Sequence, residues 1–271
     1  MCMLCKKLDK AELPTFLAMS GDEWIAETKE DGDRVRAVVT PEGVALYNRR
    51  GVEVTDTYPE LQDLKADAKS FMIDGEMCVL DERGVSQFNA GITHRSHCKS
   101  PESVKAHLGD YPVTYVVFDV LSVENEDIRD RTWEVRRQTL EHLNINHSHV
   151  KLCEYSDDIK DIWDRQVALG GEGIILKRKD SIYQEDKRSN SWLKVKDIKE
   201  VDLIFTKYED HNAGITIETA EGIRCVCNGA QSSEVKQKLL DKGSIEVTIR
   251  HLGQTPAGKY RQPTFMKLVE E

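Results

Sequence analysis

The chain has 271 residues, of which 32% are charged and 39% are hydrophobic, a composition typical of soluble globular proteins. This length allows one large domain or two moderate ones. No apolar run reaches the length of a membrane span, and Met1 to Lys10 lack the apolar stretch of a secretory signal. We therefore expect a cytoplasmic protein without a membrane partner. The net charge of −10 requires that any contact with a polyanion be made by concentrated basic groups.

Alternating and β-branched segments predict strands in the first part of the chain. Ile25, Glu27 and Lys29 are expected on one side of the first strand. Turn residues 41–43 then separate two apolar segments and predict a hairpin just after Lys29. The predicted strands are residues 24–29, 35–40, 44–47, 70–80, which Asp74-Gly75 is expected to break, and 115–121.

Two helices are expected next. Thr132 can cap a helix that runs to about Leu143, and Ser156 can cap a second helix. Gly170-Gly171 is expected to end the second helix, because glycine favours the left-handed conformation found after helix C-termini. A strand over residues 173–177 follows at once.

After Lys199 short strands dominate. They are expected at residues 201–208, 214–219, 223–227 and 245–251, with one helix at about 233–241. Many short strands with a single helix are typical of a small β-barrel. We therefore predict two domains, residues 1–199 and 200–271.

Basic side chains concentrate in one short segment and outnumber the acidic ones there. They are Lys177, Arg178, Lys179, Lys187, Arg188, Lys194, Lys196 and Lys199. A solvated charged face is the alternative interpretation. With the acidic total charge, this pattern predicts weak and salt-sensitive binding to a polyanion.

Seven scattered cysteines in a chain without an export signal are expected to be free thiols. A zinc site is the alternative for five residues near the N-terminus and in a later loop, Cys2, Cys5, His94, His97 and Cys98. Their spacing matches no strong zinc-ligand pattern, so a frayed terminus and an unrelated loop are favoured.

Lys29 lies in the segment Lys-Glu-Asp-Gly-Asp-Arg at residues 29–34. A lysine amine becomes a nucleophile only when it loses its proton, which nearby cations or burial favour by lowering its pKa. Arg34, Lys194, Lys196 and a bound metal are candidate sources of this effect. By itself the segment also fits a surface hairpin.

Five further segments follow in order. They are Asn48-Arg49-Arg50-Gly51, Ile73-Asp74-Gly75-Glu76, the strand Tyr115 to Leu121 with Phe118-Asp119, Glu172-Gly173-Ile174-Ile175-Leu176-Lys177, and Trp192-Leu193-Lys194-Val195-Lys196. Together with the Lys29 segment this series resembles the covalent nucleotidyltransferase superfamily, which contains ATP-dependent DNA ligases, RNA ligases and mRNA-capping enzymes.

Within this superfamily the chain resembles small, bacteriophage-like DNA ligases. Phe118 to Leu121, the arginines after it, Arg34 and the segment Thr255-Pro256-x-Gly258-x-x-Arg261-x-Pro263-x-Phe265 carry this likeness. It implies an α+β fold, in which an adenylation (nucleotidyltransferase) domain of mainly antiparallel sheets with flanking helices precedes a small OB-fold barrel. The roles of Lys259 and Arg261 stay open, because the basic ending of many cellular ligases is absent.

The resemblance also implies roles for the site residues. Lys29 is the expected nucleophile, Glu27 accepts from the adenine amine and Phe118 stacks on the adenine face. Arg34 and Arg49 contact ribose or phosphates, including the 5′-phosphate of a nick, with Arg50 as an alternative to Arg49. Lys194 and Lys196 approach the α-phosphate, whereas Lys177 only flanks the site. Glu76 and Glu172 position Mg²⁺ or Mn²⁺. For each residue, a surface or core position without function is the alternative.

The implied activity is nick sealing. Lys29 takes AMP from ATP, the AMP passes to the 5′-phosphate of a nick in duplex DNA, and the 3′-hydroxyl displaces it. We expect a monomer. RNA joining, RNA capping and a non-catalytic nucleic-acid-binding module are the alternatives.

Overall fold

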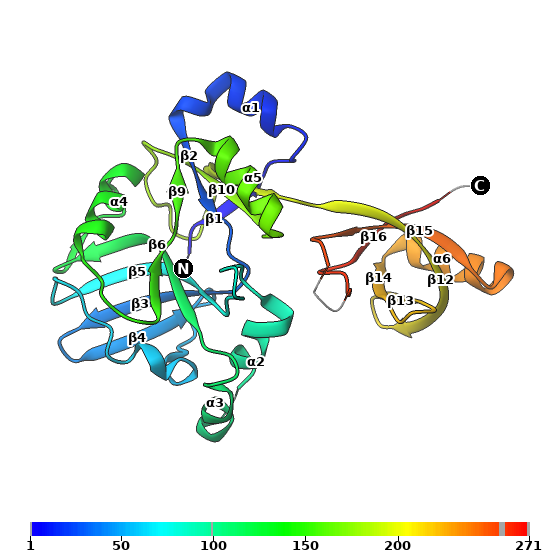
Figure 1. Cartoon of the computed structure of the whole chain (residues 1–271), viewed down its shortest axis with the longest axis horizontal. Helices are drawn as coiled ribbons and strands as arrows, with labels where there is room; N and C mark the ends of the chain where they lie inside the picture. The colour runs from blue at the N-terminus through cyan, green and yellow to red at the C-terminus, as the bar shows by residue number, and fades with distance from the viewer. Residues whose placement is uncertain (1, 99, 255–257, 270–271) are drawn as a thin grey trace. The chain divides into compact units, whose positions relative to one another are not determined.

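A computed structural model of the chain describes residues 2–98, 100–254 and 258–269 (Figure 1). It contains two compact units, Met1–Val195 and Lys196–Glu271. The sequence-based boundary after Lys199 stays a prediction. Among the described residues, every helix is too short or too polar to cross a bilayer.

The first unit contains a five-stranded sheet. β1 pairs in parallel with β11, whereas β10, β2 and β9 pair antiparallel. Helices α1 and α5 pack on this sheet through Leu13, Ile159 and Ile162. The order across the sheet is β1 (Leu4–Lys7), β11 (Arg188–Lys196), β10 (Gly173–Arg178), β2 (Trp24–Thr28) and β9 (Tyr155–Ser156), and the helices are α1 (Leu13–Ser20) and α5 (Ile159–Leu169). The N-terminal segment is therefore a sheet edge rather than the frayed terminus that we expected.

A six-stranded sheet forms the other half of this unit. Its order is β4 (Gly43–Asn48), β3 (Asp33–Thr40), β5 (Phe71–Cys78), β6 (Thr114–Val123) and β7 (Glu126–Asp127), with β8 (Val150–Leu152) parallel to β6. The predicted break at Asp74-Gly75 is wrong, because β5 continues and only its register with β6 shifts there. A side chain at Gly75 would lie 2.6 Å from the backbone oxygen of Val116, so glycine allows the strands to approach.

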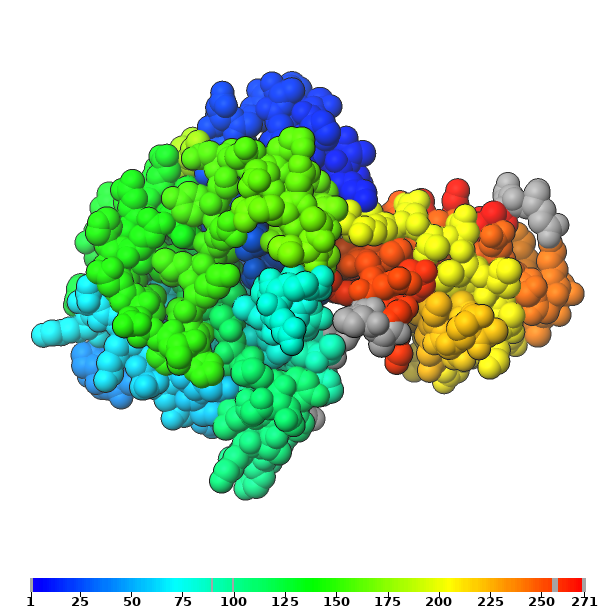
Figure 2. Space-filling model, in the orientation of Figure 1, coloured from blue at the N-terminus to red at the C-terminus, as the bar shows by residue number. Residues whose placement is uncertain are grey.

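The ends of the two predicted helices lie only in part where the sequence placed them. Thr132 caps α4 (Trp133–His142) as predicted, and Gly170 ends α5 in the left-handed conformation. The cap of α5 is Asp158 and not Ser156, because Ser156 belongs to β9 and pairs with Ala26. The short helices α2 (Thr93–Ser96) and α3 (Pro101–His107) were not predicted, and α3 projects from the first unit (Figure 2).

The second unit is a closed barrel, as predicted. Around the barrel the strands are β12 (Lys199–His211), β13 (Gly214–Thr219), β14 (Arg224–Asn228), β16 (Thr264–Leu268) and β15 (Ile245–His251), with one helix, α6 (Ala230–Lys242). The unpredicted β16 closes the barrel by pairing with β14 and β15. Of the C-terminal motif, residues 255–257, which include Thr255 and Pro256, lie outside the described residues.

Candidate active site

A cavity of about 240 Å³ opens in the first unit between residues of its two sheets. Seven of the predicted site residues line it, namely Glu27, Lys29, Arg34, Arg49, Glu76, Phe118 and Lys194. Glu172 is not among the lining residues, but it forms an ion pair with Lys29, which is. Lys196 ends β11, two residues after Lys194, and is not among the lining residues. Cys5, Lys177, Arg188 and Trp192 also line the cavity and had not been assigned to it.

Strand pairing brings Lys29 to Glu172. The backbone N–H of Lys29 donates to the Gly173 carbonyl at 3.0 Å, which places the end of β2 beside the start of β10. The Lys29 ammonium forms an ion pair with Glu172, whose side chain is only 2% exposed. Burial alone would lower the pKa of Lys29, but the nearby charges of Glu172, Glu76 and Asp31 raise it further than burial lowers it.

The expectation that cations depress the pKa of Lys29 is therefore wrong for the chain alone. After burial, the largest effects on the pKa of this amine come from carboxylates and not from Arg34, Lys194 or Lys196. Lys29 is thus held as an ammonium ion. Chemistry at its nitrogen requires that these carboxylates first be neutralised.

Gly32 allows the turn after Lys29 to lie against β5. A Cβ atom at this position would be 2.2 Å from the Met77 carbonyl oxygen and 2.9 Å from the Cys78 sulfur. The backbone N–H of Asp31 donates to the Ser86 hydroxyl at 2.8 Å and holds the same turn. The Asp-Gly pair after Lys29 is therefore a packing requirement.

Replacing Gly32 by alanine is expected to lower the free energy of unfolding by about 1–3 kcal/mol, because β5 or the turn must move. Gly109→Ala is the matched control, since an added Cβ there meets no atom within 4 Å. Chemical denaturation of both variants measures the difference. Equal stabilities would contradict the close approach.

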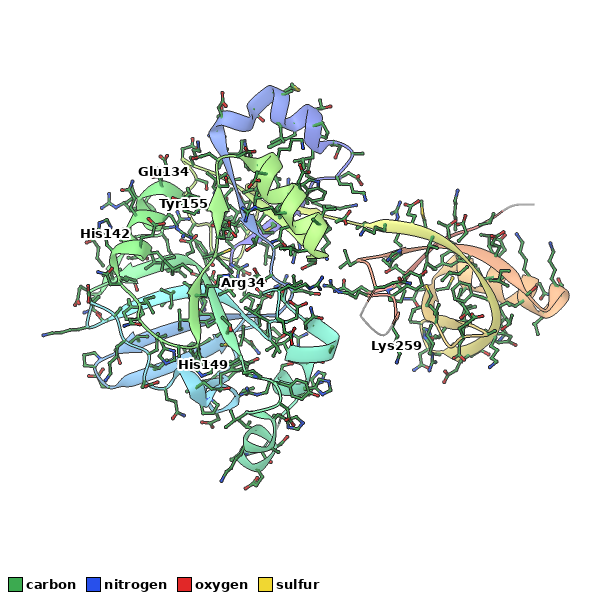
Figure 3. All side chains as sticks on the ribbon, in the orientation of Figure 1. Arg34, Glu134, His142, His149, Tyr155 and Lys259 are labelled. Atoms are coloured by element: carbon green, nitrogen blue, oxygen red, sulfur yellow. The ribbon has the colours of Figure 1, made fainter. Side chains whose placement is uncertain are left out.

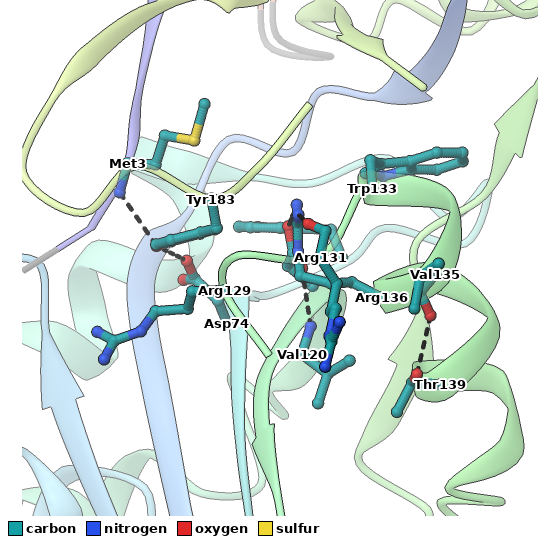
Figure 4. A network of polar contacts seen from close by, with 12 residues as sticks. Met3, Asp74, Val120, Arg129, Arg131, Trp133, Val135, Arg136, Thr139 and Tyr183 are labelled. Atoms are coloured by element: carbon teal, nitrogen blue, oxygen red, sulfur yellow. Dashed lines mark hydrogen bonds and ion pairs between the residues drawn. The ribbon is translucent and has the colours of Figure 1, made fainter. Parts of the chain in front are cut away.

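Arg34 is held by a carboxylate that sequence reasoning had not paired with it. Its Nε and Nη2 donate to the two oxygens of Asp74 at 2.9 and 2.7 Å. Tyr183 donates to Asp74 at 2.5 Å and accepts from the backbone N–H of Met3 at 3.0 Å (Figure 4). Arg34, labelled in Figure 3, also lies 4.8 Å from the centre of the Phe118 ring. A carboxylate and an aromatic ring of the chain itself therefore fix its guanidinium group.

Glu27 is buried and has two partners. Its Oε2 is 2.7 Å from the ammonium of Lys177, and the Trp133 indole N–H donates to Oε1 at 3.3 Å. Lys177, which was expected only to flank the site, is 1% exposed and lines the cavity. Strand alternation in β10 places it on the face that carries Ile175, another cavity residue.

Two aromatic rings complete one wall. Phe118 from β6 and Trp192 from β11 meet edge to face, with ring centres 6.3 Å apart. Trp192 is 1% exposed, and its indole nitrogen has no hydrogen-bond partner among the described residues. The position of Trp192 two residues before Lys194 was the signal in the sequence, since both side chains then share one face of the strand.

Arg49 and Arg50 lie at a second hollow beside the first. This cavity of about 380 Å³ is lined by both arginines and shares Arg34, Arg49 and Glu76 with its neighbour. Arg49 thus borders both cavities, whereas Arg50 borders only this one. The choice between them as a phosphate contact stays open.

Glu76 and Glu172 are the carboxylates beside Lys29. The described residues contain no group of three or more His, Cys, Asp or Glu side chains suited to a metal ion, so the five residues considered as an alternative zinc site do not come together as one. Two carboxylates nevertheless fit Mg²⁺, which usually takes one or two protein carboxylates and completes its shell with substrate phosphates and water. Burial, opposed by Lys29 and Arg34, raises the pKa of Glu76 to about 7.

The raised pKa of Glu76 makes stability depend on pH. Its ordinary value is 4.5, so the folded protein binds this proton more tightly than the unfolded chain. The resulting stability is complete below pH 4.5 and is lost as the pH rises through about 7. Without divalent metal, Glu76→Gln should raise the free energy of unfolding by about 1–3 kcal/mol at pH 8. The exposed Glu82→Gln is the control, and a gain as large at pH 4 as at pH 8 would contradict the expectation.

Comparison with known proteins now identifies the family. The family model described as ATP dependent DNA ligase domain matches residues 2–196. The chain belongs to the ATP-dependent DNA ligase family. The bifunctional non-homologous end joining protein LigD of Bacillus subtilis (strain 168) is 26% identical over 267 residues, which are 89% of this chain and 42% of that protein. A DNA ligase of Saccharolobus solfataricus is 29% identical over 205 residues, 72% of this chain and 33% of that protein. The chain thus spans less than half the length of these two relatives.

Solved ligase structures share the fold. A mycobacterial DNA ligase D complexed with ATP and MES superposes with a TM-score of 0.61 at 22% identity, covering 99% of this chain and 94% of that one. A Lig E DNA ligase, described as binding DNA with a minimal scaffold, gives 0.65 at 17% identity and covers 99% and 98%. The predicted order of a nucleotidyltransferase domain and an OB-fold barrel is therefore confirmed.

Proposed function

We propose that this chain is an ATP-dependent DNA ligase that seals nicks in duplex DNA through an AMP bound covalently to Lys29. The observation that carries the proposal is the ion pair of Lys29 with Glu172, because Lys29 lines the same cavity as Phe118. Lys29 and the Phe118 ring line the same cavity, so a base stacked on the ring would bring its nucleotide close to the Lys29 amine. Membership of the ligase family supports DNA as the second substrate.

The roles follow from position. Glu27 and Phe118 would receive the adenine, the first by accepting from its amine and the second by covering its face. Lys194 would offset charge on the α-phosphate, and the family resemblance assigns the same role to Lys196. Arg49 would contact phosphate, since it borders both cavities. Arg34 has less freedom, because Asp74 already holds it.

Glu76 and Glu172 would hold Mg²⁺ or Mn²⁺. When bound, the cation supplies positive charge that neutralises these carboxylates and offsets the phosphate charge. Lys29 would then lose the interactions that raise its pKa, and its amine could release a proton. The pairing with Glu172 therefore fits a nucleophile that becomes active only when its nucleotide site is filled.

Three exchanges of bonds make up the reaction. The Lys29 nitrogen, having lost a proton, bonds to the α-phosphorus of ATP, and the bond to pyrophosphate breaks. An oxygen of the 5′-phosphate at the nick then takes the AMP, and the Lys29 amine is restored. Finally the 3′-hydroxyl loses its proton and attacks that 5′-phosphate, and AMP leaves. Because each exchange is a phosphoryl-type transfer, positioning and charge neutralisation dominate.

The proposal extends to setting and partners. Nicked duplex DNA is the proposed partner, and we propose a monomer that acts in the cytoplasm. Part of the basic segment 177–199 is occupied within the chain, since Lys177, Arg178 and Lys179 pair with Glu27, Asp180 and Asp157. Weak and salt-sensitive binding to intact duplex therefore remains the expectation.

Two measurements test the proposal. Incubation of the chain with ATP and Mg²⁺, followed by intact-mass measurement, should show the gain of one AMP. Incubation with a nicked duplex that carries a 5′-phosphate should give the joined strand. A chain that gains no AMP, that is labelled by GTP alone, or that joins only RNA ends would overturn the proposal.

A further inference from the structure

Lys177 is a fully buried lysine for which the proposed chemistry gives no task. Its ammonium lies 2.7 Å from Glu27 and donates to the Phe118 carbonyl oxygen at 3.2 Å. The same nitrogen lies 4.7 Å from the centre of the Phe118 ring and 4.1 Å from that of Trp192. It therefore contacts an acid and two rings that line the cavity.

Sheet register explains how Glu27 and Lys177 meet. Glu27 of β2 is directly opposite Ile175 of β10, so Lys177, two residues on, is its diagonal neighbour on the same face. The Trp133 indole holds the other oxygen of Glu27. The carboxylate is thus clamped between two donors from different elements, α4 and β10, and its orientation in the cavity is set.

The fold does not require this ion pair. Removing two charges from water is costly, and an apolar pair of similar volume often stabilises a protein as well or better. A buried Glu27–Lys177 pair whose two members line the cavity is therefore better explained by a task in that cavity. Ile25, which is opposite Lys177 in the register, shows that apolar side chains fit this region.

We propose that Lys177 is a positioning residue that keeps Glu27 oriented as a hydrogen-bond acceptor, so that the cavity selects adenine over guanine nucleotides. This inference rests on the proposed function, because it assumes that Glu27 meets the base. The inference goes beyond the proposed function by naming Lys177 as the residue that makes the cavity select its base.

The chemistry of the two bases supports this role. Adenine presents an amine donor where guanine presents an oxygen acceptor. An ionised carboxylate only accepts hydrogen bonds, whereas a protonated one can also donate. Burial raises the pKa of Glu27, and the charge of Lys177 and its hydrogen bond oppose that rise, with help from Arg137 and against Asp119. Without Lys177, Glu27 would be protonated more readily and could donate to the guanine oxygen.

The test uses the full chain and measures AMP or GMP transfer to Lys29 by intact mass. The rate constants with ATP and with GTP give a selectivity ratio for each variant. We expect Lys177→Met to lower the ATP-to-GTP ratio at least about tenfold, the effect of losing one charged hydrogen bond. Lys177→Arg, which keeps the charge, should restore most of the ratio. Lys179→Met is the matched control, because Lys179 is partly exposed and pairs with Asp157.

A double-mutant cycle with Glu27→Gln shows whether Lys177 acts through Glu27. In that case Lys177→Met lowers the ratio in the parent chain and changes it less than about twofold in the Glu27→Gln background. The double variant carries no buried charge at this position, so it remains folded even if Lys177→Met alone does not. An unchanged ratio in both Lys177 variants, or equal effects in both backgrounds, would overturn the inference. A parent chain that gains no AMP from ATP would instead overturn the proposed function.

Discussion

Replacing Lys29 by alanine is expected to reduce AMP transfer to the chain by at least about a thousandfold, the scale seen when a nucleophile is removed. The amine of Lys29 is the proposed acceptor of AMP, and it forms an ion pair with the buried Glu172. Intact mass after incubation with ATP and Mg²⁺ measures the effect. Nick sealing should fall in parallel, because each later transfer needs the lysine-bound AMP.

Two further variants separate chemistry from folding. Lys29→Arg keeps a positive charge opposite Glu172 but cannot lose its proton, so it should fold like the parent chain and still gain no AMP. Lys160→Ala removes a lysine of α5 that is 77% exposed and pairs with Asp164, and it should leave AMP transfer unchanged. AMP transfer by either Lys29 variant at the parent rate would place the nucleophile elsewhere.

Replacing Asp74 by alanine is expected to lower the free energy of unfolding by about 3–5 kcal/mol, the cost of leaving a buried charge without its partner. Asp74 is fully buried, and both of its oxygens accept from Arg34. Tyr183 would lose the same acceptor. Chemical denaturation measures the change.

The controls for Asp74 test whether charge is the cause. Asp180→Ala removes the partner of Arg178 on the surface and should cost less than about 1 kcal/mol, since exposed pairs contribute little. An Asp74→Leu chain that also carries Arg34→Met lacks both charges and should recover much of the loss. If Asp74→Ala cost no more than Asp180→Ala, the Arg34–Asp74 pair would not stabilise the fold.

Lys29 and Asp74 belong to neighbouring parts of one site. Arg34 connects them, since it pairs with Asp74, lies over Phe118 and lines the cavity beside Lys29. Because two hydrogen bonds to Asp74 fix the guanidinium of Arg34, this group cannot easily change its position when a phosphate moves. Its expected part in nucleotide binding is therefore a fixed positive charge rather than a flexible clamp.

The sequence by itself predicted the two-part organisation and seven of the residues that line the cavity, but not β1, α1, α2, α3 or β16. Residues 29–34 alone fitted a surface hairpin, but the later segments ending at Lys194 and Lys196 made a nucleotidyltransferase domain predictable. The resemblance of the whole motif series to the covalent nucleotidyltransferases placed Glu27, Phe118 and Glu76 in one site. The barrel followed from short strands around one helix, although β16 has too little periodicity to be predicted.

Only the tertiary structure decided which charges meet. The carboxylates around Lys29 reversed the expected direction of its pKa shift, and the strand register turned Lys177 from a flanking residue into the buried partner of Glu27. Asp74 was visible in the sequence, but nothing there paired it with Arg34. The physical reason is common to all three. Local pattern sets the side of a strand on which a residue lies, whereas pairing, burial and pKa depend on distances between segments that are far apart in the chain.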